Sequence, residues 1–465
     1  MTRARFSGKK GSFEPSCEVN RNMLKSGVDP AILLNRYRSG FDEETSREER
    51  KMRVCIMTLG SRGDVQPYVA LGKELIKQGH AAVICTGGSF QKLIEENGVE
   101  FKETASDLMA IAQTPEGKAI LEHPIRNMRL ALRYSKEVIN PAYRKTLDDF
   151  YNAAKGADMI VYHPKALGAV DIALSLRIPC VSMPPVPITF PASEFANLAL
   201  THKNLGPVLN KLSYIINEKA EASQIKEIND FREKTLGIKR RRAGIYTYTD
   251  GLNQIPIVYP ISSLLFPDVR SWDGQVFLPG FLFLETDEEL SDEIIDFLNA
   301  GEAPVVVSFS SMPLSDPERF MKKLAQAIEK TNERVIVLTG NSGIVGKSSK
   351  EILFVKSAPH SLLFTRAKGV VHHGGVGTMA AALMAGVPQQ IIPFSVDQPF
   401  WADRLYKLGY GLKPLKEKTL SSDDLVNAFI QMSTHEVQSK AKQIGIEIQA
   451  ENGNKKLVEY LEELI

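Results

Sequence analysis

The sequence lacks several features that define specialised classes of protein. Its 465 residues include four cysteines that are widely spaced and form no CxxC pair, so neither a disulfide scaffold nor a zinc module is indicated. No run of about 18 apolar residues is present, and residues 1–20 lack the apolar core of a secretory signal. We therefore expect no spanning helix, reduced and packed thiols, and a cytoplasmic location, with peripheral contact at a membrane left open.

An excess of one charge sign is also absent. Lys and Arg number 57 against 55 Asp and Glu, which gives a formal net charge of +2. This balance provides no electrostatic footprint for nucleic acid, so we expect no nucleic-acid partner. No Asp-x-Asp pair occurs in the chain, which disfavours a divalent metal holding a diphosphate. We expect no metal and no bound cofactor, and the sequence leaves the oligomeric state open.

Strand and helix patterns alternate along most of the chain. Apolar, β-rich runs at residues 53–59 and 81–86 flank a helical pattern over 67–78, and runs at 159–163 and 179–183 flank one over 169–176. The pattern restarts with strands at 305–309, 334–339, 369–372 and 390–393 and helices over 317–331 and 378–385. Such alternation predicts an α/β fold with two doubly wound, Rossmann-like domains that face a central cleft.

The same patterns suggest boundaries. Residues 1–51 are polar and read as an appendage, with one short helix over 29–37. Residues 52–275 are expected to form the first domain, with a proline-rich connector to about residue 290 and a long amphipathic helical stretch between 208 and 235. Residues 291–445 are expected to form the second domain. Residues 446–465 are expected to form a C-terminal helix that packs back on the first domain.

The loop after the first strand reads Gly60-Ser61-Arg62-Gly63-Asp64. Its glycines permit a tight turn with exposed backbone amides. Asp64 stands at the mouth of the next helix, where it either caps that helix or serves as a general base in the cleft. The loop lacks the GxGxxG fingerprint of dinucleotide-binding proteins, which disfavours a dehydrogenase.

The most specific motif is His372-His373-Gly374-Gly375-Val376-Gly377-Thr378, at a strand-to-helix junction. Its glycines free amides at a helix N-terminus to bind phosphate, with the Thr378 hydroxyl and His372 as added donors. Because neighbouring residues of a strand point to opposite faces, the histidine pair is not expected to share a metal. A tight turn without a ligand is the alternative.

A third motif, from Pro393 to Trp401, follows the next strand. Asp397 and Gln398 can hydrogen-bond adjacent hydroxyls of a sugar, and Trp401 can offer an apolar ring face. A plain helix start is the alternative. Two weaker candidates are Ser310–Met312, whose hydroxyls would lie near a diphosphate, and Ala358–His360, which would bracket a base.

These motifs together resemble a known family. The segments GSRGDVQPYVALGKEL (60–75), VHHGGVGTMAAAL (371–383) and PFSVDQPFWADRL (393–405) are similar to those of GT-B-type nucleotide-sugar glycosyltransferases, above all sterol 3-beta-glucosyltransferases. Antibiotic-aglycone glycosyltransferases show a similar pattern. The resemblance covers residues 52 to about 450, and it implies that the first domain binds the acceptor and the second binds the nucleotide sugar.

The resemblance also implies a role for each matched residue. Asp64 matches the general base, and His372 matches the histidine that contacts the diphosphate. Asp397 and Gln398 match the pair that binds the donor sugar. The remaining matched positions are implied to lie at the donor: Ser61, Arg62, Ser311, Ala358, His360, Gly374, Gly375, Val376, Gly377 and Thr378.

The implied function is an inverting transfer of a hexose, with glucose favoured, from a UDP-sugar to a hydroxyl of an apolar acceptor, with a sterol favoured. A natural-product aglycone or glycolipid acceptor, with a UDP- or dTDP-sugar, is the main alternative. A nucleotide-sugar epimerase on the same architecture and a non-catalytic sensor of nucleotide sugar or lipid are further alternatives. No metal is required in this interpretation, and the nucleotide sugar is a co-substrate.

Overall fold

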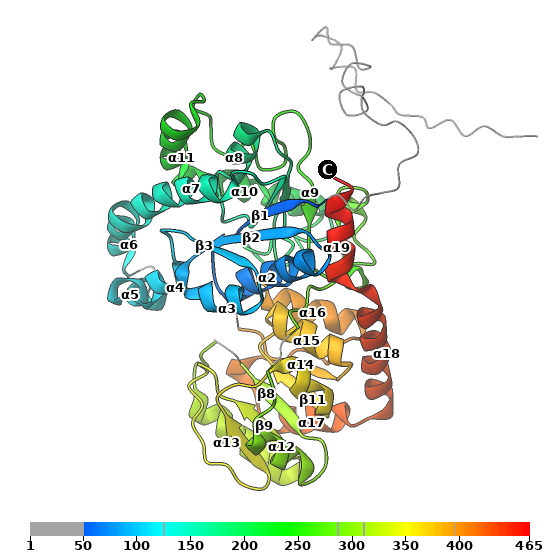
Figure 1. The fold of residues 1–465 in the computed structure, drawn as a ribbon. Coiled ribbons are helices and arrows are strands. Elements are labelled where there is room, and N and C mark those ends of the chain that lie inside the picture. Colours follow the sequence, from blue (N-terminus) through cyan, green and yellow to red (C-terminus); the bar gives the residue numbers. More distant parts are fainter. Residues whose placement is uncertain (1–50, 124–125, 286–287, 310–311, 395) are drawn as a thin grey trace, which may run out of the picture. The chain divides into compact units, whose positions relative to one another are not determined.

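The computed structural model describes residues 51–465, except 124–125, 286–287, 310–311 and 395 and the side chains of residues 121 and 122. Residues 51–465 form one compact unit. The short helix expected over 29–37 and Cys17 lie outside the described residues. Figure 1 shows the described part as helices and strands that alternate along the chain.

The N-terminal half contains a seven-stranded parallel sheet in the order β3-β2-β1-β4-β5-β6-β7. Parallel strands need crossovers, and the helices between them supply these. Central strands are buried on both faces, which is why they are continuous apolar runs. The strands are β1 (Arg53–Met57), β2 (Ala81–Thr86), β3 (Glu100–Glu103), β4 (Met159–Tyr162), β5 (Cys180–Ser182), β6 (Ile257–Val258) and β7 (Val276–Phe277).

The C-terminal half contains a five-stranded parallel sheet in the order β10-β9-β8-β11-β12. In both sheets the order reverses beside the first strand, between β1 and β4 and between β8 and β11. The predicted α/β fold with two Rossmann-like sheets is confirmed. The strands are β8 (Val305–Ser308), β9 (Val335–Leu338), β10 (Ile352–Val355), β11 (Gly369–His372) and β12 (Gln389–Ile391).

The helices cover these sheets (Figure 1). In the N-terminal half they are α2 (Arg62–Lys77), α3 (Gln91–Glu96), α4 (Leu108–Gln113), α5 (Pro115–Glu122), α6 (Met128–Tyr134), α7 (Asn140–Ala154), α8 (Ala169–Leu176), α9 (Pro207–Ser213), α10 (Ile215–Ala220) and α11 (Ile225–Phe231). The later ones are α12 (Asp292–Asn299), α13 (Pro317–Thr331), α14 (His360–Leu363), α15 (Val376–Ala385), α16 (Gln398–Leu408), α17 (Ser422–Met432), α18 (His435–Glu451) and α19 (Gly453–Glu462).

Several expected boundaries were wrong. Helix α2 begins at Arg62 rather than at residue 67, because Ser61 and Asp64 form a capping box that starts the helix inside the expected loop. The helical stretch expected between 208 and 235 is present, but as consecutive short helices rather than one: α9, α10, a 3-10 helix over Glu221–Ser223, α11 and a π-helix over Arg232–Leu236. Strand β3 escaped prediction because its sequence, EFKE, is charged and suits only the sheet edge that it occupies.

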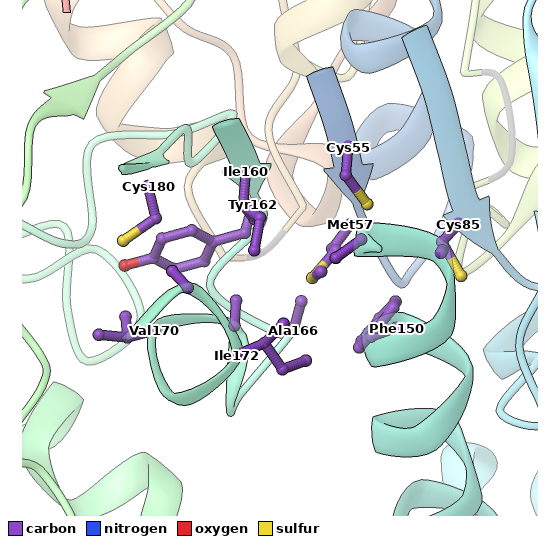
Figure 2. Packing of buried hydrophobic residues seen from close by; sticks show 14 of the residues in the cluster. Cys55, Met57, Cys85, Phe150, Ile160, Tyr162, Ala166, Val170, Ile172 and Cys180 are labelled. Carbon is purple, nitrogen blue, oxygen red and sulfur yellow. The ribbon is translucent and has the colours of Figure 1, made fainter. Parts of the chain in front are cut away.

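One core cluster shows how the described cysteines are used. Cys55, Cys85 and Cys180 are free and buried, and Figure 2 shows them among apolar residues that include Met57 and Phe150. Burial raises the pKa of the Cys55 and Cys180 thiols to about 12. These thiols therefore stay protonated and act as small apolar side chains, as the sequence predicted.

The last two helices join both halves. Helix α18 packs on α15 in the C-terminal half, and α19 packs on α2 in the N-terminal half. Leu457, Val458 and Leu461 of α19 enter the core cluster that contains β1. The α18–α15 packing is close because glycines meet there: a Cβ atom on Gly445 would lie 2.6 Å from the Cα of Gly386. Among residues 51–465 as described, no helix is long and apolar enough to cross a membrane.

We expect Gly445→Ala to destabilise the protein by about 1–3 kcal/mol, the usual cost of forcing a methyl group into a packed contact. Chemical denaturation followed by circular dichroism measures this. Lys442→Ala is the matched control, because Lys442 lies exposed on the same helix. Equal stability of both variants would contradict the close approach of α18 and α15.

Candidate functional site

Asp64 and the glycine-rich turn lie where the strand order of each sheet reverses. In doubly wound sheets, ligands bind beyond the carboxyl ends of the strands at this switch point. In the first sheet, Asp64 follows β1 and His163 follows β4. In the second sheet, the glycine-rich turn follows β11, the neighbour of β8. The topology therefore places a candidate site at the switch point of each half.

Asp64 is the third residue of α2, and both of its carboxylate oxygens are engaged. Oδ2 accepts from the Ser61 backbone N–H at 2.7 Å and from the Ser61 hydroxyl at 2.9 Å. The same oxygen lies 2.9 Å from Lys165 Nζ. Oδ1 lies 3.1 Å from Nε2 of His163. Asp64 therefore caps α2, and it also contacts a buried histidine and a lysine.

These partners keep Asp64 ionised. Burial alone would raise the pKa of the carboxyl, but hydrogen bonds and charge from His163 and Lys165 outweigh burial and hold that pKa well below its usual range. The His163 ring accepts from the Lys165 backbone N–H through Nδ1 at 3.0 Å, which leaves Nε2 to donate to Asp64. Gly60 is needed here: with φ +145, its Cβ would lie 2.2 Å from Asp64 Oδ2.

The glycine-rich turn opens α15 in a form that suits an anion. Gly374 has φ +90, and a Cβ there would lie 2.8 Å from Ile391 Cγ2, so a larger residue would push the turn away. Gly375 is the N-cap of α15, and no side-chain hydrogen bond caps the helix there. A Cβ on Gly377 would meet nothing within 4 Å. This helix end, with Val376 and Thr378 in its first turn, fits a phosphate group.

His372 does not present the donor that the sequence led us to expect. Its ring is wholly buried: Nε2 lies 2.9 Å from the Gln389 side-chain oxygen, and Nδ1 accepts from the Gly374 backbone N–H at 3.1 Å. It therefore holds the turn from behind. Strand alternation places His373 on the opposite face, where its Nε2 would be 2.5 Å from a Cβ on Gly375. His373 is thus the imidazole beside the turn.

Three histidines near this turn are neutral at pH 7. Burial lowers the pKa of His373 to about 4. Burial and, to a lesser extent, nearby positive charge lower the pKa of His360 to about 4 and that of His372 to about 3. The His360 ring also stacks on Phe364, with centroids 4.6 Å apart. A diphosphate placed beside them would favour their protonated forms.

The third motif differs in part from expectation. Trp401 is wholly buried, and its indole N–H donates to Asp397 Oδ2 at 2.7 Å. It offers no ring face to a ligand, because α16 turns this side chain into the core. Gln398 Oε1 accepts from the Phe394 backbone N–H at 2.8 Å. Val396, just before this pair, has φ +57, which a β-branched residue rarely adopts.

Electrostatic effects connect the two halves. The charge of Arg62 contributes to the lowered pKa of His360. The charge of Asp64 contributes to the raised pKa of Asp397, where burial is the larger cause. Ser61 caps α2, and Ala358 lies partly buried two residues before His360. The structure therefore brings the first and third motifs near each other. Ser311 lies outside the described residues.

Sequence reasoning missed His163, Lys165 and His373. Residues 163 and 165 follow a strand that pairs with β1, and that adjacency was the available signal. In the part of the chain that the structure describes, no three His, Cys, Asp or Glu side chains gather as metal ligands.

Comparison with known proteins agrees with this arrangement. Residues 54–155 match the glycosyltransferase family 28 N-terminal domain, and residues 322–464 match the C-terminal domain of erythromycin biosynthesis protein CIII-like proteins. Among solved structures, the calicheamicin glycosyltransferase CalG4 superposes with a TM-score of 0.65 at 18% identity, over 89% of this chain and 98% of that one. Glycosyltransferase SnogD of Streptomyces nogalater has a TM-score of 0.59 at 17% identity, over 90% and 100%. These define the fold as GT-B.

Curated relatives by sequence are sterol 3-beta-glucosyltransferases. Sterol 3-beta-glucosyltransferase UGT80A2 of Arabidopsis thaliana is 32% identical over 86% of this chain and 64% of its own length. UGT80B1 of the same plant is 30% identical over 88% and 68%. The sterol 3-beta-glucosyltransferase of Yarrowia lipolytica is 30% identical over 87% of this chain and 28% of its own length. This chain belongs to the GT-B glycosyltransferase family that includes these proteins, and it spans about two thirds of the plant relatives.

We expect stability to fall as the pH is lowered from 7 to 5. An unfolded histidine has a pKa of about 6.5, whereas folded His373 has a pKa of about 4. Between these values the unfolded state binds a proton that the folded state does not, so stability rises with pH through this window and is full above it. His373→Gln should reduce the slope of unfolding free energy against pH by up to about 1.4 kcal/mol per pH unit.

Urea denaturation at several pH values measures this slope. His435→Gln is the control, because His435 lies exposed on α18. An unchanged slope in the His373 variant would mean that the folded protein protonates this ring as readily as the unfolded chain does.

Proposed function

We propose that this protein is an inverting glycosyltransferase that moves glucose from UDP-glucose to the 3-hydroxyl of a sterol. The observation that carries the proposal is an ionised carboxylate and an uncapped, glycine-rich helix N-terminus, each at the switch point of its sheet. The names of the curated relatives support a sterol acceptor and a glucosyl donor.

The proposed step is a single displacement. The acceptor hydroxyl gives its proton to Asp64 while its oxygen bonds to the anomeric carbon of the sugar. The bond from that carbon to the diphosphate breaks on the opposite face, and its electron pair leaves with UDP, so the anomeric configuration inverts. The first-turn amides of α15 stabilise the negative charge that develops on the leaving group.

Asp397 and Gln398 are proposed to bind the hydroxyls of the transferred sugar. The indole N–H of Trp401 holds the Asp397 carboxylate in place through Oδ2. Ser61, Arg62, Ser311, Ala358 and His360 are proposed to line the donor, and no metal takes part. A dTDP-sugar with a natural-product acceptor is the second candidate, favoured by the fold of the antibiotic glycosyltransferases.

We further propose that the protein touches a membrane through the region around α9. Its apolar side chains there are exposed, and exposed Lys203 and Lys211 accompany them. Lysines beside apolar residues suit a bilayer that contains anionic lipid. The α9 surface consists of Leu205 (44% exposed), Val208 (71%), Leu209 (55%), Leu212 (51%) and Ile215 (43%).

Asp64→Asn should bind UDP as the wild type does and lose transfer by at least about 100-fold, the scale of a lost general base. A thermal-shift titration with UDP and a radiolabelled transfer assay with UDP-glucose and a sterol measure the two properties. Gly374→Ala, in contrast, should weaken UDP binding, because the added Cβ would displace the glycine-rich turn.

The same assays discriminate the alternatives. Stabilisation by dTDP but not by UDP would move the proposal to natural-product acceptors, and turnover of the sugar without acceptor would indicate an epimerase. Transfer by Asp64→Asn at the wild-type rate would contradict the proposed role of Asp64 as general base. Transfer should survive EDTA, and its loss there would contradict metal-independent chemistry.

The membrane proposal predicts cosedimentation with vesicles of phosphatidylcholine and phosphatidylserine, and weaker cosedimentation with phosphatidylcholine alone. Val208→Asp with Leu212→Asp should reduce binding at least about tenfold, since each apolar side chain contributes about 1.5–3 kcal/mol when buried. Leu132→Asp is the control, because Leu132 is as exposed on α6. Equal loss in the control, or no binding by the wild type, would overturn this proposal.

A further inference from the structure

Four hydrogen-bond donors already converge on Asp64. They are the Ser61 amide and hydroxyl, His163 Nε2 and Lys165 Nζ, at 2.7 to 3.1 Å. A carboxylate offers about four lone-pair positions over its two oxygens. Three of the four donors share Oδ2, which has about two lone pairs, whereas Oδ1 receives only His163. An acceptor hydroxyl that approaches Oδ2 therefore meets a crowded oxygen, and one donor has to leave it.

The four donors differ in how easily they leave. The Ser61 amide and hydroxyl belong to the capping box of α2 and are fixed by the helix. The side chain of His163 is only 4% exposed and is held through Nδ1 by the Lys165 backbone. The side chain of Lys165 is 49% exposed. A lysine has a flexible four-carbon stem and a strongly hydrated ammonium, so water replaces Asp64 as its partner at small cost.

We propose that Lys165 is a displaceable partner of the catalytic base: it occupies Asp64 Oδ2 in the free enzyme, and the acceptor hydroxyl takes its place. His163 is the fixed partner that orients the carboxylate. The inference rests on the proposed function, because it assumes that Asp64 receives the proton of the acceptor.

The displacement has a chemical consequence. With Lys165 in place, the carboxylate is a weak base because a cation neutralises it. When the acceptor hydroxyl replaces the ammonium, the carboxylate loses that cation and becomes a stronger base at the atom that receives the proton. Acceptor binding and base strength are thus coupled, and Lys165 is a positioning residue that competes with the acceptor. The charge of Asp64 also contributes to the raised pKa of Tyr68 on α2 and to that of Asp397, the N-cap of α16.

Steady-state transfer assays on the full chain test this. Lys165→Met keeps the stem and removes the competitor, so KM for the acceptor should fall about two- to fivefold, the range for a half-exposed ion pair. UDP affinity should stay unchanged, and kcat should stay equal or rise. Lys165→Arg keeps the charge and should keep the wild-type KM or raise it. Raising the salt concentration should lower KM in the wild type and not in Lys165→Met, because salt screens this ion pair.

The outcomes separate the two proposals. If Asp64→Asn transfers sugar at the wild-type rate, the base role fails and this inference fails with it. If Asp64→Asn is inactive and Lys165→Met has an unchanged or higher KM, or a lower kcat, the base role stands and displacement by the acceptor is refuted. Circular dichroism of each variant separates a fall in kcat from loss of folded protein.

Discussion

The pairing of β4 directly beside β1 is the constraint on which the candidate chemistry depends. Because both strands are parallel, their carboxyl ends meet at one edge, and the residues that follow them become neighbours. Asp64 lies after the first strand, and His163 and Lys165 lie about 100 positions later in the chain. Without this adjacency, Asp64 would be an ordinary helix-capping carboxylate with solvent on its other side.

The second half repeats the arrangement with a different purpose. There the chain turns sharply at Gly374 after β11, and it enters α15 with no side-chain cap at Gly375. The histidine behind the turn fixes its geometry by accepting from the Gly374 amide. The first half thus holds a negative charge at its switch point, whereas the second leaves the positive end of a helix free. This opposition is what a transfer between an acceptor hydroxyl and a diphosphate leaving group requires.

Much of this could be predicted from the sequence, and the failures have physical causes. The positions of Asp64 and of the glycine-rich turn in loops after strands could be predicted, because an apolar run that ends in glycine is a local signal for a strand followed by a turn. Which of His372 and His373 faces the turn depends on the rotation of β11, which alternation alone does not reveal. Trp401 was expected at a ligand, but the orientation of α16 buries it. Lys165 has no local sequence signal, because the pairing of β4 with β1 is what brings it to Asp64.

The chain end that completes the N-terminal core has a bearing on biosynthesis. Helix α19 supplies Leu457, Val458 and Leu461 to the cluster around β1, and Glu462 contacts His80 across 382 positions of sequence. A ribosome releases these residues long after the first sheet has emerged. The face of α2 that they cover is therefore open during most of translation. The first half reaches its final packing only after the second half has been made.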